Sequence, residues 1–349
     1  MSLAATLLLD IRAGYPSNLD RYERKQTQHG LLTAVLEMTD SSNSIISRDL
    51  KAKALVSQGR NLDVPVMQKG TITIKNVRSC VIDCAESTSG LVRINWKTMV
   101  ADICMVPAQY ELNEIGYQED FAKKIAETVE AFKTNMEIDI ETALDASKSQ
   151  VYASTLVGTK YALAGNEIQV TPVNRPLFFN DVDTINFSDD FYYDNVKVIG
   201  SPTLMGFVRE YINQGGGTKE NLAWQFAGKD FMFSNRVTND AGVLATGFFM
   251  PDGSVGLLTR VDADARMRAT ATDGTEWFED SLPGLPFTVG IQYKSKCTDK
   301  SALIATNTAH LTATKVEHWQ ISFDYAIVTP YNSDLATKAG SIRKFEFLP

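Results

Sequence analysis

The feature that most constrains the fold is a run of 41 residues, 117–157, that contains neither glycine nor proline. Apolar side chains recur within it at steps of three or four residues, the spacing of one helical face. They are Ala122, Ile125, Val129, Phe132, Met136, Ile140 and Ala143. A wholly helical run of this length spans about 60 Å. Because the stripe has no leucine and covers barely three heptads, it predicts a long helix laid across a sheet rather than a coiled coil.

The start of this helix is marked by its polar residues. Asn113 is a candidate cap, and Glu119 and Asp120 suit the positive end of the helix dipole. Lys123 and Lys124 follow these two acids at the i,i+4 spacing that supports ion pairs along a helix.

The clearest strand pattern lies on the N-terminal side of the long helix. Residues 62–67 and 71–75 alternate apolar and polar side chains around a turn at 68–70, which predicts a β-hairpin. Pro65 has no backbone N–H to donate, so its strand is expected at an edge. A two-stranded ribbon is marginal in water, so this hairpin is expected to lean on another surface. Residues 92–96 alternate as a further strand.

Beyond Gly158 the chain mixes short elements. Strands are predicted at 196–199, 231–233, 243–250, 255–259 and 319–327. A helix is predicted from Pro202 to the glycines at 215–217, and Pro251-Asp252-Gly253 is typical of a turn. Since the regular βαβ rhythm of a doubly wound sheet is missing, the class indicated is α+β.

Charge is unevenly distributed along the chain. Residues 48–78 contain seven basic and two acidic residues, a net charge of +5. Residues 111–145 contain ten acidic residues and three lysines, a net charge of −7. Two interpretations are open: solvated faces that differ by chance, or complementary surfaces through which copies of the chain dock. The basic stretch lacks interleaved aromatic residues, which disfavours nucleic-acid binding there.

Composition restricts the function classes. The chain has 349 residues and a net charge of −8, and an acidic balance disfavours a dedicated nucleic-acid binder. No window approaches the ~18 consecutive apolar residues of a membrane span, so no membrane partner is expected. Residues 1–10 lack the features of a signal peptide. We therefore expect Cys80, Cys84, Cys104 and Cys297 to be reduced thiols in a cytoplasm.

No motif predicts catalysis or a cofactor. The three histidines lack a surrounding motif, the cysteines lack zinc-site spacing, and residues 215–219 have the wrong order for a phosphate loop. The carboxylate pairs Asp262/Asp264 and Asp181/Asp183 come nearest to a cation or acid–base site, but solvated loops are the favoured interpretation in a chain with 42 acidic residues. We expect no catalytic, cofactor-binding or metal-binding residues, and no enzyme.

The order of the elements is an arm, a projecting basic hairpin, a return strand, one very long helix, a compact mixed region and a closing strand. Two groups of residues add to this layout. They are Pro107-Ala108-Gln109-Tyr110, Asn113-Glu114-Ile115, Tyr117 and Asp120-Phe121 at the helix entry, and Asn221-Leu222-Ala223-Trp224 before Phe226 and Phe231. Layout and residues together resemble the major capsid proteins of tailed bacteriophages, which share the Hong Kong 97 fold. The second group is similar to a segment of their axial domain.

The resemblance implies an α+β, Hong Kong 97-type fold in four parts. These are an N-terminal arm (1–48), an extended loop (49–98), a peripheral domain with the spine helix (99–160 and 315–349) and an axial domain (161–314). It implies a structural protein that self-assembles, as pentamers and hexamers, into an icosahedral shell around a double-stranded DNA genome without sequence-specific binding. The implied location is the virion, after assembly in the host cytoplasm. Portal, scaffolding and decoration proteins stay open as further partners.

The resemblance also implies two inter-subunit surfaces. The extended loop would contact a neighbour through Arg60, Leu62, Val64, Val66, Lys69, Ile72, Ile74 and Lys75. The acceptor surface on the neighbour's spine helix would comprise Glu119, Asp120, Glu127, Glu130 and Glu137. Some family members crosslink subunits through a Lys–Asn isopeptide bond. Lys69 is the candidate lysine here, but no partner asparagine or glutamate can be placed opposite it, so no crosslink is predicted.

Three other functions stay open on the sequence. An encapsulin-type nanocompartment shell has the same fold and holds cargo protein in place of DNA. A carboxylate- or metal-dependent hydrolase would use Asp262 and Asp264 and stay a small oligomer. A tail-tube protein would form rings and stacked tubes. The size and contents of the particle that the purified chain forms distinguish these functions.

Overall fold

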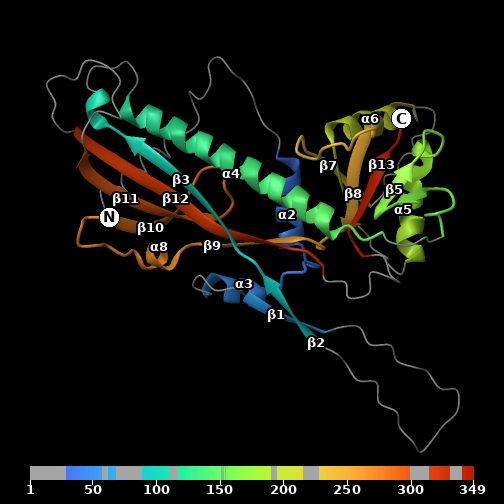
Figure 1. Ribbon diagram of the computed structural model, residues 1–349, viewed down its shortest axis with the longest axis horizontal. Helices are drawn as coiled ribbons and strands as arrows, with labels where there is room; N and C mark the ends of the chain where they lie inside the picture. Colours follow the sequence, from blue (N-terminus) through green and yellow to red (C-terminus); the bar gives the residue numbers. More distant parts are fainter. Residues whose placement is uncertain are drawn as a thin grey trace, which may run out of the picture.

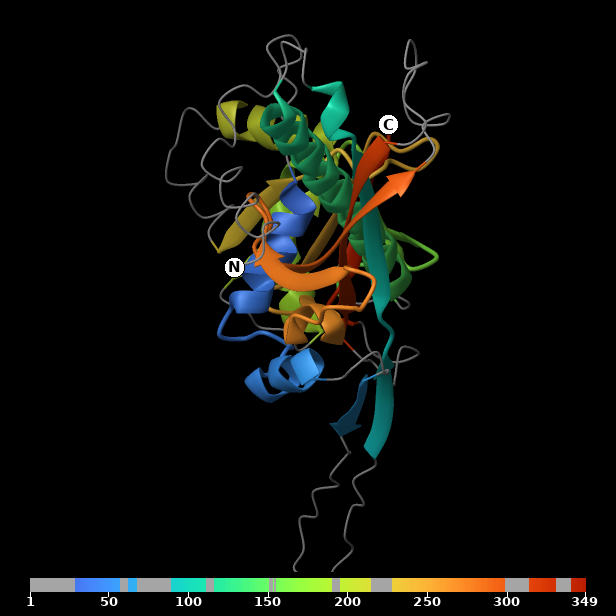
Figure 2. The ribbon, with the colours of Figure 1, turned by 90° about the vertical axis from the view of Figure 1, so that its left-hand side faces the viewer.

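The computed structural model describes residues 29–56, 62–67, 89–110, 116–150, 153, 155–189, 195–214, 228–298, 314–330 and 340–349. Two β-sheets with their covering helices form the body of the molecule, and a two-stranded ribbon projects away from it (Figures 1 and 2). Helices and strands alternate irregularly along the chain, which confirms the α+β class. Within the described ranges, no helix has both the length and the apolar character that crossing a membrane requires.

The first sheet carries the long helix. Its strands run in the order β10 (Glu276–Ser281), β11 (Thr288–Thr298), β12 (Thr314–Val328) and β3 (Lys97–Met105), and β9 (Gly256–Arg260) pairs with the end of β12. All these neighbours are antiparallel. Helix α4 (Tyr117–Ser147) lies along one face of the sheet (Figure 1), as the sequence predicts. It ends well before Val157, because Lys148 adopts an extended ψ of 135°.

Aromatic side chains join α4 to this sheet. Alternate residues of β12 are buried, and the ring of Trp319 lies 4.8 Å from that of Phe121 between centroids, while Phe323 meets Phe132 edge-on at 5.1 Å. The buried face of α4 follows the predicted stripe in its middle. At its two ends Phe121 and Leu144 are buried, whereas the alanines next to them are only partly buried.

The second sheet runs in the order β4 (Ala162–Ala164), β5 (Glu167–Val170), β13 (Arg343–Phe347), β8 (Ala245–Pro251), β6 (Val196–Gly200) and β7 (Lys229–Phe233). The pairs β13–β5 and β6–β7 are parallel and the others antiparallel. Helices α5 (Arg175–Ser188) and α6 (Pro202–Gln214) contribute to its apolar core, where Phe178 meets the rings of Phe345 and Phe347.

The central strands of the second sheet are buried on both faces. In β8, Phe249 joins the core beneath α5, whereas Phe248 and Met250 join the core that contains α4 and α2 (Gly30–Asp40). This double burial explains why residues 243–250 form an almost continuous apolar run rather than an alternating one. The predicted turn follows β8: Gly253 has φ +82°, and the N–H of Ser254 donates to the carbonyl of Pro251.

Helix α2, which falls within the predicted N-terminal arm, packs against its own chain. Its apolar residues are buried in the main core, and they include Leu31, Leu32, Ala34, Val35 and Met38. The apolar spacing of residues 31–38 is that of a helical face, and α4, β6, β7 and β9 lie against it. Residues 1–28, the rest of the predicted arm, lie outside the described residues.

The ribbon consists of β1 (Leu62–Met67) and β2 (Ser89–Ile94), paired antiparallel with Leu62 opposite Ile94. Strand β1 is a ribbon strand, as predicted, but its described partner is β2, which continues into β3. The predicted turn at 68–70 and strand at 71–75 lie outside the described residues and stay predictions. Helix α3 (Arg48–Val56) lies beside the base of the ribbon (Figure 2).

The membership of the two sheets differs from the predicted division of the chain. Strands β9, β10 and β11 belong to the first sheet although they fall within 161–314, and the short helix α8 (Ala263–Met267) lies between β9 and β10 in the chain. Strand β13 falls within 315–349 but belongs to the second sheet. The reason is that β12 takes partners on both sides, while Phe345 and Phe347 draw β13 into the aromatic core around Phe178.

Candidate functional site

The ribbon has one face against its own chain. The register places Leu62 and Val64 on the same face as Val92 and Ile94. Leu62, Val64 and Ile94 pack in a small apolar cluster with residues that include Ile46 and Leu50, from the region of α3. The predicted loop residues Leu62 and Val64 are therefore half-buried within the subunit.

The other face of the ribbon is open. Pro65 lies opposite Leu91, and both are exposed, Leu91 at 73%. Asp63 and Arg93 are the neighbouring cross-strand pair, with Arg93 Nε 2.9 Å from the Asp63 carboxylate. The guanidinium bond lowers the pKa of Asp63. This open face combines an apolar pair with an ion pair, which suits contact with another surface.

The remaining loop residues of the prediction are not tested by these contacts. Arg60, Lys69, Ile72, Ile74 and Lys75 lie outside the described residues, and so do Cys80 and Cys84. Val66 is described in its backbone, opposite Gly90. Their role as contact residues stays a prediction.

The predicted acidic residues of the spine helix fall into three environments. Glu119 and Glu127 are exposed, and Glu127 pairs with Lys123 at 3.8 Å. Asp120 and Glu130 are partly exposed and bonded within the chain, Asp120 to Lys124 and Glu130 to His29. Glu137 is completely buried. Its assignment to an acceptor surface is wrong, because a side chain with no exposed area cannot contact a neighbouring subunit.

Glu137 caps helix α2 from another helix. Its Oε1 accepts the backbone N–H groups of Leu31 at 2.9 Å and Leu32 at 3.2 Å, which have no partner within α2. Its Oε2 accepts from Ser234 Oγ at 3.2 Å and lies 3.4 Å from His29 Nδ1. Since α2 has no capping side chain of its own, the Glu137 carboxylate neutralises the positive end of that helix and ties α2 to α4 and β7.

Two tyrosine hydrogen bonds hold the start of α4 in position. Tyr110 O–H donates to Asp120 at 2.5 Å, and Tyr117 O–H donates to Glu317 on β12 at 2.5 Å. Burial and the bond to Asp120 raise the pKa of Tyr110 to about 12. Burial disfavours ionisation of Asp120, but the bonds from Tyr110 and Lys124 outweigh it and lower its pKa. The predicted cap Asn113 lies outside the described residues, and Gly116 is the residue before the helix.

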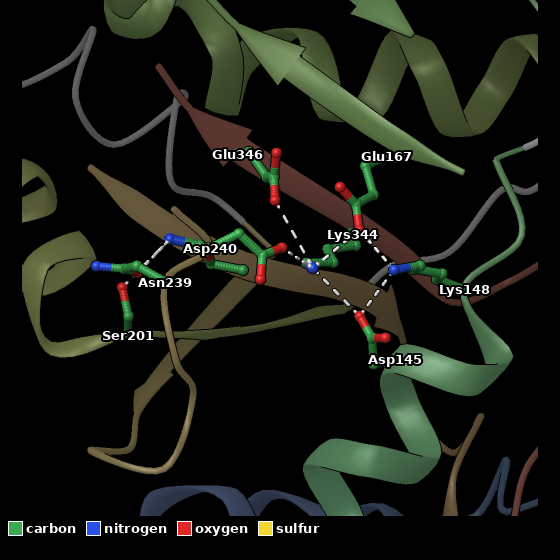
Figure 3. A network of polar contacts seen from close by, with 9 residues as sticks. Asp145, Lys148, Glu167, Ser201, Asn239, Asp240, Lys344 and Glu346 are labelled. Atoms are coloured by element: carbon green, nitrogen blue, oxygen red, sulfur yellow. Dashed lines mark hydrogen bonds and ion pairs between the residues drawn. The ribbon is translucent and has the colours of Figure 1, made fainter. Parts of the chain in front are cut away.

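A second polar cluster lies where α4 meets the second sheet (Figure 3). We call it the junction cluster, and its members are Asp145, Lys148, Glu167, Asp240, Lys344 and Glu346. Lys344 Nζ lies 2.7 Å from Asp240, 2.9 Å from Glu167, 3.2 Å from Asp145 and 3.7 Å from Glu346. Lys148 adds bonds of 2.9 Å to Asp145 and 2.5 Å to Glu167. A cavity of about 460 Å³ borders it, lined in part by Glu141.

The junction cluster holds more negative than positive groups. Burial disfavours charge on Lys344, but its carboxylate partners outweigh burial and raise its pKa. Burial, a bond to Asp240 and the charge of Glu167 raise the pKa of Glu346 to about 7. Near neutral pH, a proton on part of the Glu346 population therefore reduces the excess negative charge of the cluster.

Three carboxylates of the junction cluster lie close enough together to hold a metal ion. Carboxylate oxygens of Glu167, Asp240 and Glu346 lie within 4.8 Å of one another. The ammonium group of Lys344 already lies among them and supplies the positive charge that a cation would supply. The contacts favour an internal ion cluster. The sequence signal that could have located it is the alternation of Lys344 and Glu346 with two buried phenylalanines on β13.

The carboxylate pairs considered in the sequence do not converge on one site. Asp262 and Asp264 flank the start of α8, and both are exposed. Asp181 binds Lys160 and accepts from Tyr161 O–H at 2.7 Å, whereas Asp183 binds Lys229 at 2.7 Å. Each of the latter two carboxylates therefore has its own lysine.

No protein-family model matches this chain, and no curated protein matches it. Solved structures do match. A structure of Mycobacterium phage Che8 aligns over 95% of this chain and 95% of its own, with 8% identity and a TM-score of 0.51. The capsid of a native GTA particle aligns over 96% of this chain and 95% of its own, with 10% identity and a TM-score of 0.51. The capsid of Myoviridae phage XM1 aligns over 97% and 98%, with 9% identity and a TM-score of 0.49.

The chain has the Hong Kong 97 capsid fold. That assignment rests on the first two structures, whose alignments span nearly the whole of both chains. The fold predicted from the order of the elements is thereby confirmed. Identities of 8% and 10% mean that the likeness lies in the path of the chain and not in its residues.

Proposed function

We propose that this chain is a major capsid protein that self-assembles into the icosahedral shell enclosing a phage double-stranded DNA genome. The observation that carries this proposal is the alignment with the capsid of a native GTA particle over 96% of the chain. A match of that extent is not confined to one of the two sheets. The virion is then the place where the chain resides, and its first partner is a further copy of itself.

The ribbon supports the proposal by its position and its surface. It projects from the body (Figures 1 and 2), its inner face packs on the residues around α3, and its outer face leaves Leu91 and Pro65 exposed. In an isolated subunit, Leu91 and Pro65 stay in contact with water and add no hydrophobic stabilisation. A shell buries that pair against an adjacent subunit.

The exposed acids of α4 are the proposed acceptor for the basic loop. Glu119 and Glu127 are free to face a neighbour, and Asp120 and Glu130 add partial exposure, whereas Glu137 is removed from this surface. The loop stretch 48–78 has a net charge of +5. Charge complementarity of this kind orients the docking of copies more than it adds affinity.

The proposed parts follow the sheets. The first sheet with α4 is the peripheral domain, the second sheet with α5 and α6 is the axial domain, and the ribbon belongs to the extended loop. Copies meeting through the axial domain form pentamers and hexamers. The net charge of −8 suits a shell that encloses DNA without binding its phosphates tightly.

The test is to purify the chain and measure its particles by sedimentation and electron microscopy. Closed shells are the expected result. A folded monomer whose size is indifferent to concentration would refute the proposal, and so would stacked tubes. Nuclease treatment followed by analysis of the contents separates two kinds of shell, because protected DNA supports a genome container and a packaged foreign protein indicates a nanocompartment.

A further inference from the structure

Cys104 lies on the open face of the first sheet, beside a histidine. It is on β3, an edge strand, and its neighbours Ile103 and Met105 point into the core. The antiparallel register places His318 of β12 directly opposite, and Cys104 Sγ is 3.3 Å from His318 Nδ1. The thiol is exposed. A nucleophile and a base are thus within hydrogen-bond distance at a place that a small molecule reaches.

The imidazole is directed at the thiol and not at another group. Its second nitrogen, Nε2, is buried and has no hydrogen-bond partner in the described part of the chain. The strand on the other side of β12 places Lys294 opposite His318, where it pairs with Asp273. Lys124 Nζ lies 3.4 Å from the carbonyl oxygen of Cys104. Both lysines are also held by carboxylates, Lys294 by Asp273 and Lys124 by Asp120, so the imidazole is the group in contact with the thiol itself.

We propose that Cys104 is a reactive thiol that forms a mixed disulfide with a low-molecular-weight disulfide such as glutathione disulfide, with His318 as the base. His318 Nδ1 takes the thiol proton, and the Cys104 thiolate attacks one sulfur of the disulfide. A new S–S bond forms as the old one breaks, and the departing thiolate takes up a proton. Cys104 is oxidised and the departing sulfur is reduced, so one disulfide and one thiol are present before and after the step.

The chain provides its own comparison in Cys297. That thiol is also exposed, but the register places Lys315 opposite it, and Lys315 pairs with Glu317 at 2.8 Å. Both cysteines are therefore accessible on the same sheet, and only Cys104 has an imidazole as its cross-strand partner. Because Cys297 has a lysine opposite it, the effect of His318→Gln on the Cys104 rate, and not the comparison of the two cysteines alone, isolates what the imidazole contributes.

The experiment treats the reduced, purified full-length chain with glutathione disulfide at neutral pH and follows each cysteine by peptide mass spectrometry. We expect Cys104 to react about tenfold faster than Cys297. His318→Gln should remove about that factor at Cys104 and leave the Cys297 rate unchanged, which also reports that the sheet is intact. Equal rates at the two cysteines, or a Cys104 rate that His318→Gln does not alter, would overturn the proposal.

The pH profile of the unaltered chain gives a second readout that needs no variant. With His318 as base, the pH dependence of the Cys104 rate between about 6 and about 8 should differ from that of the Cys297 rate, because only the Cys104 reaction passes a proton to an imidazole. Parallel profiles for the two cysteines would show that Cys104 reacts as an ordinary surface thiol.

Discussion

Replacing Glu137 by glutamine should destabilise the chain much more than the same replacement on an exposed turn of the same helix. Glu137 is buried, and its carboxylate accepts the first N–H groups of α2 at 2.9 and 3.2 Å. Glutamine keeps the size of the side chain and one oxygen acceptor. It removes the negative charge at the helix N-terminus and places an amide N–H₂ toward Ser234 and His29.

The expected magnitude follows from these contacts. A hydrogen bond to a charged group contributes about 1.5–3 kcal/mol, roughly twice a neutral one, and a charge at a partly buried helix terminus contributes up to about 2 kcal/mol. Glu137→Gln should therefore lower the free energy of unfolding by about 2 kcal/mol. Glu137→Ala, which leaves both amides unpaired and opens a cavity, should lower it by about 3–5 kcal/mol.

The matched control is Glu127→Gln. Glu127 is exposed on α4 and pairs with Lys123 at 3.8 Å, so its loss should cost less than about 0.5 kcal/mol. Urea unfolding of the unassembled chains, followed by circular dichroism and tryptophan fluorescence, compares the variants. If Glu137→Gln and Glu127→Gln unfold at the same urea concentration, the capping role of Glu137 is refuted.

Four further outcomes are expected. Burial raises the pKa of Glu346 from its ordinary 4.5 to about 7, so between these pH values the folded chain holds a proton that the unfolded chain releases, and stability falls as the pH rises. Glu346→Gln should therefore resist urea better than the original chain at about pH 8 and lose that advantage toward about pH 5. An unchanged pH dependence of stability in the variant would contradict this. Lys344→Met removes the ion-pair partner of Asp240 and Glu346, while Lys148 still holds Asp145 and Glu167. The variant should lose about 3–5 kcal/mol of unfolding free energy, part of which millimolar calcium should restore in the variant but not in the original chain. Leu91→Asp should prevent shell formation without changing the unfolding midpoint, whereas Leu91→Met should leave assembly intact; a loss of stability in the aspartate variant would show that Leu91 belongs to the monomer's core. Glu119→Lys combined with Glu127→Lys should slow assembly as measured by light scattering, and insensitivity of the original chain's assembly to added salt would argue against the charged docking.

The parts of the fold that were predictable depend on neighbouring residues in the chain. The spacing of Ile125, Val129, Phe132 and Met136 sets a helical face wherever that segment packs, and α4 has that face. The alternation from Trp319 to Tyr325 likewise specifies a strand with one buried side. Local periodicity is sufficient for such elements because the geometry of the backbone repeats every 3.6 or 2 residues.

The junction cluster and the cap of α2 were not predictable in this way. Glu137 has the same chemistry as Glu127, and only the docking of α2 against α4 makes one buried and leaves the other exposed. Lys344 forms ion pairs with carboxylates from α4, β5 and the segment before β8. Asp240, in that segment, is 104 residues from Lys344 in the sequence. No local pattern carries information about which distant charge will be brought into contact.

By itself, the sequence determined the long helix, most of its buried face, five strands of the second half (β6 to β9 and β12) and the order of elements that indicates a capsid fold. Tertiary structure alone decided that β1 pairs with β2, that β13 enters the second sheet while β12 stays in the first, and that Glu137 lies inside the molecule. The physical reason is that elements form from interactions a few residues apart, whereas strand partners and buried charges are selected by the competition of the whole chain for the same apolar interior.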